Sequence, residues 1–143
     1  MAVVVFDADV LIAYLGRDDA HHAEAVERMR NALAPATRRF LSAVNYSEVL
    51  IGPLAKHGVQ GADTVDAMLV RFNIETIQVD MDLARRAAAV RAHTRLKLPD
   101  AFALATAVHA EKRGHADVRV ETFDERVIRA RKSLHLGEED DTG

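Results

Sequence analysis

Short, valine-rich apolar runs that lead directly into helix-like patterns are the feature that most restricts how this chain folds. Residues 2–6, AVVVF, form the first such run, and an apolar helical pattern over residues 9–16 follows at once. A continuous apolar run of this length is typical of a strand that is buried on both faces. We therefore expect a parallel strand in a sheet that helices cover.

The same alternation continues along the chain. Further strands are predicted at residues 38–43, 74–79 and 117–122, and the SLHL stretch at 133–136 is a candidate fifth strand. Helices are expected over residues 20–33, 43–56, 62–72, 81–96, 99–114 and 124–132. Strands that alternate with helices favour an α/β fold with a mostly parallel sheet of four or five strands.

Capping residues support several of these helices. Ser42 and Asp80 are suited to N-caps, and Pro99 is suited to a first helical turn. The helix after Pro99 carries five alanines, at positions 101, 103, 105, 107 and 110, which implies close approach to a neighbouring element.

The length of 143 residues suits one domain, which we place at residues 1–136. Residues 137–143, GEEDDTG, are expected to form an acidic and disordered tail. The formal net charge is −3, of which the four tail acids contribute −4, so the body carries +1. Such a nearly neutral body neither requires nor excludes a polyanionic partner, because the local distribution of charge matters more.

Basic residues are concentrated in two strips on this balanced body. One strip spans residues 83–99, which include Arg85 and Arg91 and contain no acidic residue. The other strip begins at Arg126. Solvated helix faces explain such strips most simply, and phosphate binding is the alternative.

Two absences narrow the function further. The chain has no cysteine, which excludes disulfides, thiolate metal sites and cysteine nucleophiles. No run approaches the roughly 18 apolar residues of a membrane span, and no secretion signal precedes the first strand. We therefore expect a soluble cytoplasmic protein.

Two acids follow predicted strands. Asp7 comes directly after the first strand, and Asp124 comes just after the fourth. In parallel sheets, sites form beyond the carboxyl ends of the strands where the strand order reverses. Asp7 and Asp124 are thus expected to share one edge of the sheet.

Two other acids lie on apolar helix faces. Glu48 is flanked at helical spacing by Val44 and Ile51, and Asp100 lies on a face that continues through Ala103 and Leu104. Burying a charge is costly unless a cation, a metal or protonation compensates it. Taken singly, each acid has a simpler structural explanation. Asp7, Asp100 and Asp124 lie where helix N-termini favour negative charge, and Thr122 and Glu125 have the spacing of a capping box. An arginine partner would compensate Glu48.

Together, the four acids are harder to explain as independent caps. If they converge, their mutual repulsion requires a cation, and oxygen ligands without thiolates suit Mg²⁺ or Mn²⁺. Such ions catalyse phosphodiester hydrolysis by orienting the phosphate and activating water. The seven histidines form no metal-binding pair and are expected to have surface or structural roles.

Four stretches resemble the motifs of one family, in order. VVVFDADVLIAYL resembles the first motif of the PIN domains, particularly those of VapC-type toxins from toxin–antitoxin pairs. SAVNYSEVLIG is similar to the second motif, whose glutamate is Glu48 in this chain. LKLPDAFALATA closely resembles the third motif, with Asp100, and VETFDERVI resembles the fourth, with Thr122 and Asp124. The resemblance spans residues 2 to about 136 and implies a three-layer α/β/α sandwich.

The resemblance also implies an activity. A protein of this kind is a metal-dependent endoribonuclease that acts as a toxin, forms a homodimer and is neutralised by a small VapB-like antitoxin. By position, Asp7 and Asp100 are the main ligands of Mg²⁺ or Mn²⁺, and Glu48 and Asp124 complete the catalytic cluster. Asp9 departs from the serine, threonine or asparagine usual there, and either joins the second ligand shell, as Thr122 does, or caps the helix, which we favour. Arg85, Arg91 and Arg126 are candidates for RNA binding.

Other functions remain possible at this point. FDADV also resembles the first motif of haloacid dehalogenase-type phosphatases, in which Asp7 would attack phosphorus and Asp9 would act as acid and base. That function needs a later lysine, for which Lys97 is a candidate, but Val10 replaces the usual glycine and Leu104 stands where a further acid would help. A non-catalytic domain that binds RNA or protein, and a response-regulator receiver, are weaker alternatives.

Overall fold

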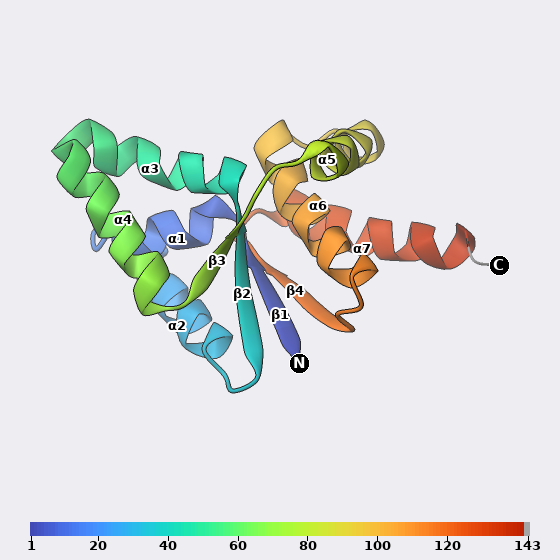
Figure 1. Ribbon diagram of the computed structural model, residues 1–143, viewed down its shortest axis with the longest axis horizontal. Coiled ribbons are helices and arrows are strands. Elements are labelled where there is room, and N and C mark those ends of the chain that lie inside the picture. Colours follow the sequence, from blue (N-terminus) through green and yellow to red (C-terminus); the bar gives the residue numbers. More distant parts are fainter. Residues whose placement is uncertain (142–143) are drawn as a thin grey trace.

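The computed structural model describes the backbone of residues 1–141 and the side chains of residues 1–134. A parallel sheet lies between two layers of helices, as Figure 1 shows. The strands are β1 (Ala2–Phe6), β2 (Thr37–Ser42), β3 (Ile74–Ile77) and β4 (Asp117–Glu121). The helices are α1 (Ala8–Leu15), α2 (His22–Ala32), α3 (Ala43–His57), α4 (Val59–Arg71), α5 (Met81–Thr94), α6 (Leu98–Lys112) and α7 (Glu125–Asp141).

The order of the strands places a reversal beside β1. The described residues form a four-stranded sheet in the order β3-β2-β1-β4, and every pair is parallel. The chain therefore moves outward from β1 through β2 to β3 and then returns to add β4 on the other side. The carboxyl ends of β1 and β4 flank this switch point, which is where open α/β sheets form their sites.

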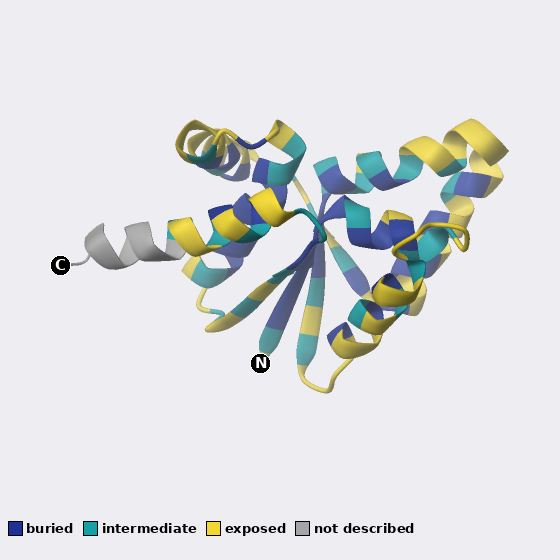
Figure 2. Cartoon of the chain, turned by 180° about the vertical axis from the view of Figure 1, so that it is seen from behind, coloured by how far each residue is buried: buried dark blue, intermediate teal, exposed yellow. Residues whose placement is uncertain are grey.

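Alternate residues of β1 face opposite layers. Val4 and Phe6 pack with α1, α2 and α4, whereas Val3 and Val5 pack with Ala107 of α6. All four strand side chains are fully buried, and Figure 2 shows β1 dark blue over most of its length. The expected strand with two buried faces is confirmed.

The alanine-rich helix is the most deeply buried helix of the described chain. Residues 101–108 and Ala110 of α6 are all buried. Small side chains allow α6 to lie close both to the sheet and to α5, so the expected close approach is confirmed.

Helix capping agrees with the sequence. The side chain of Ser42 accepts a hydrogen bond from the backbone N–H of Asn45 at the start of α3, and Asp80 accepts one from Leu83 at the start of α5. Pro99 lies in the first turn of α6. The capping box considered as an alternative role for Thr122 is not what the hydrogen bonds of its hydroxyl indicate, because Thr122 Oγ1 donates to Asp7 and accepts from the N–H of Asp124.

The C-terminal region differs from one expectation. The candidate strand at residues 133–136 is part of α7, whose Val127, Ala130 and Leu134 pack against the cluster that contains α6. This spacing continues the apolar face of a helix, so the strand prediction was wrong. The predicted acidic tail, residues 137–143, lies outside the residues whose side chains are described, and the domain boundary stays a prediction.

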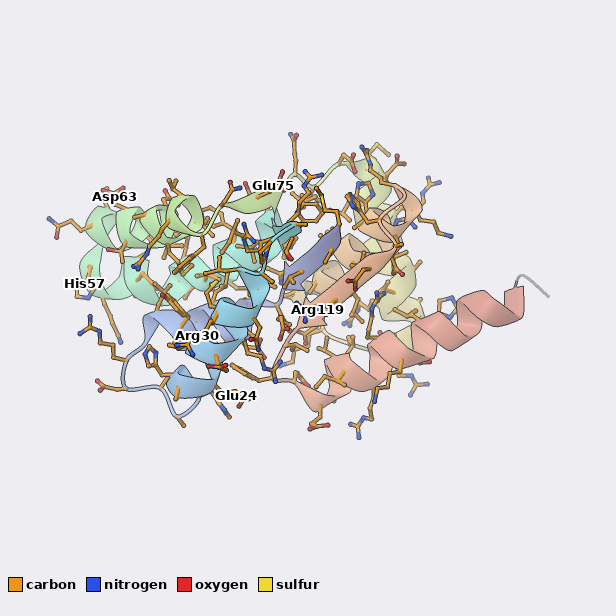
Figure 3. The ribbon with its side chains drawn as sticks, turned by 90° about the horizontal axis from the view of Figure 1, so that it is seen from below. Glu24, Arg30, His57, Asp63, Glu75 and Arg119 are labelled. Atoms are coloured by element: carbon orange, nitrogen blue, oxygen red, sulfur yellow. The ribbon has the colours of Figure 1, made fainter. Side chains whose placement is uncertain are left out.

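Charged side chains cover the outer surface of the helices. In Figure 3, Glu24 and Arg30 of α2 and Asp63 of α4 extend outward, and all three residues are exposed. Among the described residues, no helix is long and apolar enough to cross a bilayer.

Candidate functional site

Asp7 is held at the junction of β1 and α1. Its backbone N–H donates to the carbonyl of Glu121 at 2.9 Å, which joins the ends of β1 and β4. Its Oδ1 accepts from the N–H of Ala8 at 2.9 Å, and its Oδ2 accepts from Oγ1 of Thr122 at 2.9 Å. The residue is only 3% exposed. The switch point thus holds a buried carboxylate in a fixed orientation.

Asp9 lies in the first turn of α1 and joins the same site. Its Oδ2 accepts from the N–H of Phe123 at 2.9 Å and from Oγ1 of Thr122 at 3.4 Å. Its Oδ1 is buried and has no hydrogen-bond partner within the part of the chain that the structure describes. Asp7, not Asp9, is the N-cap of α1, so the cap favoured for Asp9 was wrong. The extra carboxylate instead ties α1 to the loop after β4.

Asn45 connects the elements that carry the other two acids. Its buried side chain donates from Nδ2 to Oε2 of Glu48 at 3.1 Å and to the carbonyl of Pro99 at 3.0 Å. Its Oδ1 accepts from Oγ of Ser42 at 2.6 Å. One amide therefore orients Glu48 and holds the N-terminus of α6, where Asp100 lies, against α3.

The acids influence one another electrostatically. Burial, followed by the charges of Asp9 and Asp100, raises the pKa of Asp7 to about 7. Burial also raises the pKa values of Asp9 and Glu48, and the charge of Asp100 adds to both shifts. These four carboxylates, from β1–α1, α3 and α6, therefore occupy one neighbourhood, as the sequence predicted for three of them.

Asp124 lies at the margin of this neighbourhood. Its carboxylate contacts the guanidinium of Arg126 at 3.1 Å, and this interaction lowers its pKa. Its charge nevertheless adds to burial in raising the pKa of Asp100. Asp124 thus approaches the cluster but has its own cation, in contrast to the other acids.

The four inner acids, Asp7, Asp9, Glu48 and Asp100, differ from Asp124 in that they form no close ion pair with a described side chain. Within the part of the chain with described side chains, the ion pairs do not include Asp7, Asp9, Glu48 or Asp100. In that same part, no group of three histidine, aspartate or glutamate side chains is close enough to hold a metal ion as it stands. The donor chemistry still fits a hard dication, because the oxygens are carboxylates and one buried oxygen, Asp9 Oδ1, has no hydrogen-bond partner among the described side chains and backbone.

The predicted RNA-binding arginines are not gathered in one place. Arg126 lies next to the acids and, with Lys97, lowers the pKa of Asp100 against the larger effect of burial. Arg91 donates to the carbonyl of Leu96 at 2.6 Å, in the connection between α5 and α6. Arg85 lies exposed on α5.

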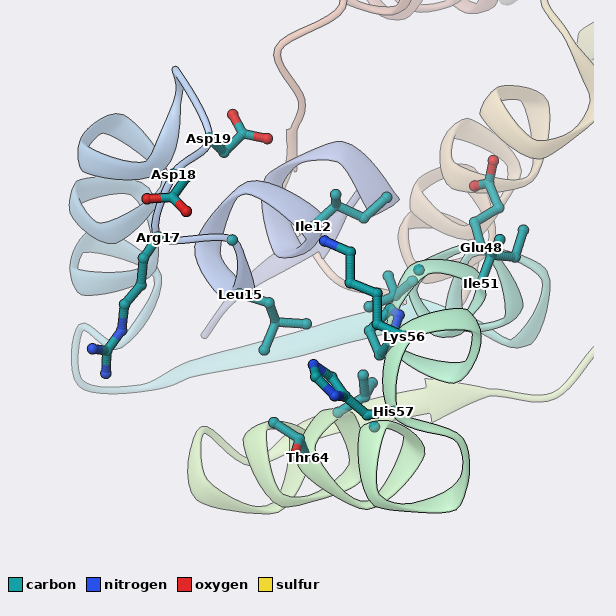
Figure 4. A pocket seen from close by; sticks show the side chains of 16 residues that line it. Ile12, Leu15, Arg17, Asp18, Asp19, Glu48, Ile51, Lys56, His57 and Thr64 are labelled. Carbon is teal, nitrogen blue, oxygen red and sulfur yellow. The ribbon is translucent and has the colours of Figure 1, made fainter.

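Two hollows adjoin the acidic cluster. The larger, of about 880 Å³, lies between α1, α3 and α4, and Figure 4 shows Ile12, Leu15, Ile51 and Glu48 around it. The smaller, of about 370 Å³, is lined by residues of α1, the α1–α2 connection and the β4–α7 loop, namely Asp9, Ile12, Ala13, Asp19, His21, Phe123 and Asp124.

Sequence reasoning missed three residues of this region. Asn45 precedes Glu48 by three residues on the same helix, and that spacing was the available signal for its contact. His21 and Phe123 stack on each other from segments about a hundred residues apart, and no local pattern indicates such a contact.

The fold and the site define a class of protein: an α/β sandwich with an acidic cluster of oxygen donors at the switch point of a parallel sheet. The PIN domain family model matches residues 4–133, so this chain belongs to the PIN domain family. The resemblance in the four motifs is thereby confirmed. The phosphatase alternative based on Asp7 and Asp9 receives no support from this match.

Solved structures agree with the family. A toxin–antitoxin complex from Klebsiella pneumoniae is 26% identical over 87% of both chains, with a TM-score of 0.63. Mycobacterium tuberculosis VapC20, described as a sarcin-ricin loop cleaving toxin, is 19% identical, covers 86% of this chain and 92% of its own, and has a TM-score of 0.63. VapBC-1 from nontypeable Haemophilus influenzae is 13% identical over 92% and 93%, with a TM-score of 0.65.

Because VapC20 and VapBC-1 are only 19% and 13% identical to this chain, their likeness shows the fold alone. Among curated proteins, none matches the sequence of this chain.

Proposed function

We propose that this protein is a metal-dependent endoribonuclease and the toxin of a VapBC-type toxin–antitoxin pair. The observation that carries this proposal is the cluster of Asp7, Asp9, Glu48 and Asp100, electrostatically coupled to one another at the switch point of a PIN fold. The likeness to a toxin–antitoxin complex, at 26% identity, supports the proposed biology.

Asp7 and Asp100 would be the main ligands of Mg²⁺ or Mn²⁺, with Glu48 and Asp124 completing the set. When bound, the ion would orient the scissile phosphate, acidify a water and stabilise the leaving oxygen. Thr122 fixes the second oxygen of Asp7, and Asn45 fixes Glu48. A carboxylate whose pKa is raised by burial accepts the proton of the attacking water.

Cleavage of RNA tests the proposal directly. We expect the purified protein to cleave single-stranded RNA with Mg²⁺ or Mn²⁺ and to lose this activity with a chelator. Asp7→Asn and Asp100→Asn should each abolish cleavage, whereas Asp63→Asn, an exposed site on α4, should not change it. Turnover of small phosphate monoesters without RNA cleavage would instead support a phosphatase, and cleavage that survives both substitutions would refute the assignment.

A small VapB-like antitoxin is the proposed protein partner. The larger hollow supports it, because its wall is largely apolar and its rim exposes Ile12 and Ile51, at 43% and 67%. An apolar antitoxin segment in this hollow would cover the approach to Glu48. The candidate antitoxin is the product of a small open reading frame adjacent to that of this protein.

Substitution of the rim tests this partner. Ile51→Asp should weaken antitoxin binding and leave RNA cleavage intact, because Ile51 lines the hollow without contributing a metal ligand. The matched control is Val70→Asp, since Val70 is 82% exposed and lies outside the hollow. Equal antitoxin affinity of the two variants would contradict the proposed docking surface.

We further propose that the protein is a homodimer that acts in the cytoplasm, where its RNA substrate is found. The molecular mass in solution, measured by light scattering at micromolar concentration, should be twice that of the 15.7 kDa chain. A monomeric mass would contradict the dimer.

A further inference from the structure

The smaller hollow lies directly beside the acidic cluster and is not used by the catalytic proposal. Asp9 connects the two, because its Oδ2 holds the N–H of Phe123 while its Oδ1 is buried and unpartnered. Asp124 also lines this hollow. The hollow therefore adjoins the acids at which a phosphate would bind, within reach of a neighbouring nucleotide of an RNA chain.

An aromatic pair forms one wall of the hollow. The rings of His21 and Phe123 stack with centroids 5.0 Å apart and an interplanar angle of 24°. The side chain of His21 is 60% exposed, so the stack ends in a ring that solvent or a ligand can reach. Ile12 and Ala13 add an apolar surface next to it.

The stack is held in place from several directions. The guanidinium of Arg28 lies 5.2 Å from the centre of the Phe123 ring and is itself fixed by Glu121 at 2.7 Å. The backbone N–H of His21 donates to Oδ1 of Asp19 at 2.8 Å. These contacts hold the Phe123 ring and the backbone of His21 in place before a ligand arrives, which lowers the entropy cost of binding.

From this geometry we infer that the hollow is a subsite for one base of single-stranded RNA, which stacks on His21 next to the scissile phosphate. This inference rests on the proposed nuclease function and extends it. Proteins recognise unpaired RNA bases by stacking them on aromatic rings, including histidine and phenylalanine, and such stacking tolerates any base. A volume of about 370 Å³ with one aromatic and one apolar wall suits a planar base.

Cleavage of RNA with a missing base tests the subsite. We expect His21→Ala to lower kcat/KM about tenfold on single-stranded RNA, whereas His21→Tyr keeps the stack and the rate. An abasic residue next to the cleaved bond should cost the wild type about the same factor and cost His21→Ala nothing more. His93→Ala, an exposed histidine of α5, is the matched control. If the abasic residue lowers kcat/KM of His21→Ala by the same factor as that of the wild type, the two losses are independent and the subsite is refuted.

A binding measurement separates this inference from the catalytic proposal. An RNA oligonucleotide with one 2-aminopurine is titrated with each protein in the presence of a chelator, so that no cleavage occurs. Quenching by the wild type and His21→Tyr, but not by His21→Ala, supports the subsite even if the protein cleaves no RNA. RNA cleavage by the wild type together with equal quenching by all three proteins overturns the subsite and leaves the nuclease proposal standing.

Discussion

Burial of Asp7 makes the site electrostatically costly in the absence of a cation. The pKa of this carboxyl rises to about 7 from an ordinary value of 3.8, so the folded chain binds its proton more tightly than the unfolded chain. The contribution of Asp7 to the free energy of unfolding is therefore greatest below about pH 4, and it is lost as the pH rises from about 4 to 7. Asp9, Glu48 and Asp100 act in the same direction, and Asp124 acts in the opposite direction.

Asp7→Asn should therefore stabilise the metal-free protein at pH 8, by up to about 4 kcal/mol, and by much less at pH 4. The free energy of unfolding, measured with urea at both pH values and with a chelator present, checks this. Asp63→Asn serves as the control, because Asp63 is exposed on α4. An equal effect of Asp7→Asn at both pH values would show that Asp7 does not titrate as described.

The positions of the acids in the chain predicted much of their surroundings. Asp7 was expected at the sheet edge because it follows a buried strand, and Glu48 and Asp100 were singled out because they lie on apolar helix faces. The role of Asp9 was not predicted, since its partner, the N–H of Phe123, is 114 residues away in the chain. Contacts of this kind depend on strand order, which no single residue specifies.

Helix α3 and helix α6 are joined through Asn45, and this contact has a measurable electrostatic effect. The hydrogen bond from Asn45 lowers the pKa of Glu48, against the larger effect of burial, which raises it. Asn45→Ala should therefore move the acid limb of the pH profile of RNA cleavage to higher pH. It should also destabilise the fold by about 1–3 kcal/mol, because the carbonyl of Pro99 loses its donor.

Ser47→Ala is the control on the same helix, because the Ser47 hydroxyl donates to the carbonyl of Val44 within α3 and so does not join α3 to α6. Loss of stability in Asn45→Ala without any shift of the acid limb would mean that Asn45 is purely structural.

The crossing of α3 and α4 depends on Gly61. A Cβ atom at this position would lie 2.0 Å from the carbonyl oxygen of Pro53, so Gly61→Ala should destabilise the fold by about 1–3 kcal/mol. Gly52 lies in the same helix pair with open space around it, and Gly52→Ala should stabilise by up to about 1 kcal/mol. Thermal unfolding of both variants checks the contrast. Similar melting temperatures for the two would contradict the close approach.

The alternation of strands and helices was predictable because β1 is a continuous apolar run and several helices begin at a capping residue. The SLHL stretch was not, since its alternation favours a strand when it is considered alone. In the folded chain, Leu134 continues the apolar face that begins with Val127 and Ala130, and packing against α6 decides in favour of the helix. At residues 133–136, packing against α6 therefore determined the secondary structure, and the local alternation of apolar residues did not.

Across the whole molecule, the sheet topology brings together carboxylates from separate segments at one edge. The family match and the four motifs agree on this arrangement, whereas metal binding and the share of each acid in it are proposals. The central claim is that these carboxylates jointly bind a hard dication in the folded protein.

Titration calorimetry of Mn²⁺ binding at pH 6, where the Asp7 carboxyl is still largely protonated in the metal-free protein, tests this claim most directly. We expect the wild type to bind Mn²⁺ with release of protons, because the ion displaces protons from carboxyls whose pKa values burial raises. Asp7→Asn and Asp100→Asn should each lose binding while remaining folded, and Asp63→Asn should bind as the wild type does. Binding of equal affinity and stoichiometry in all four proteins would contradict the claim.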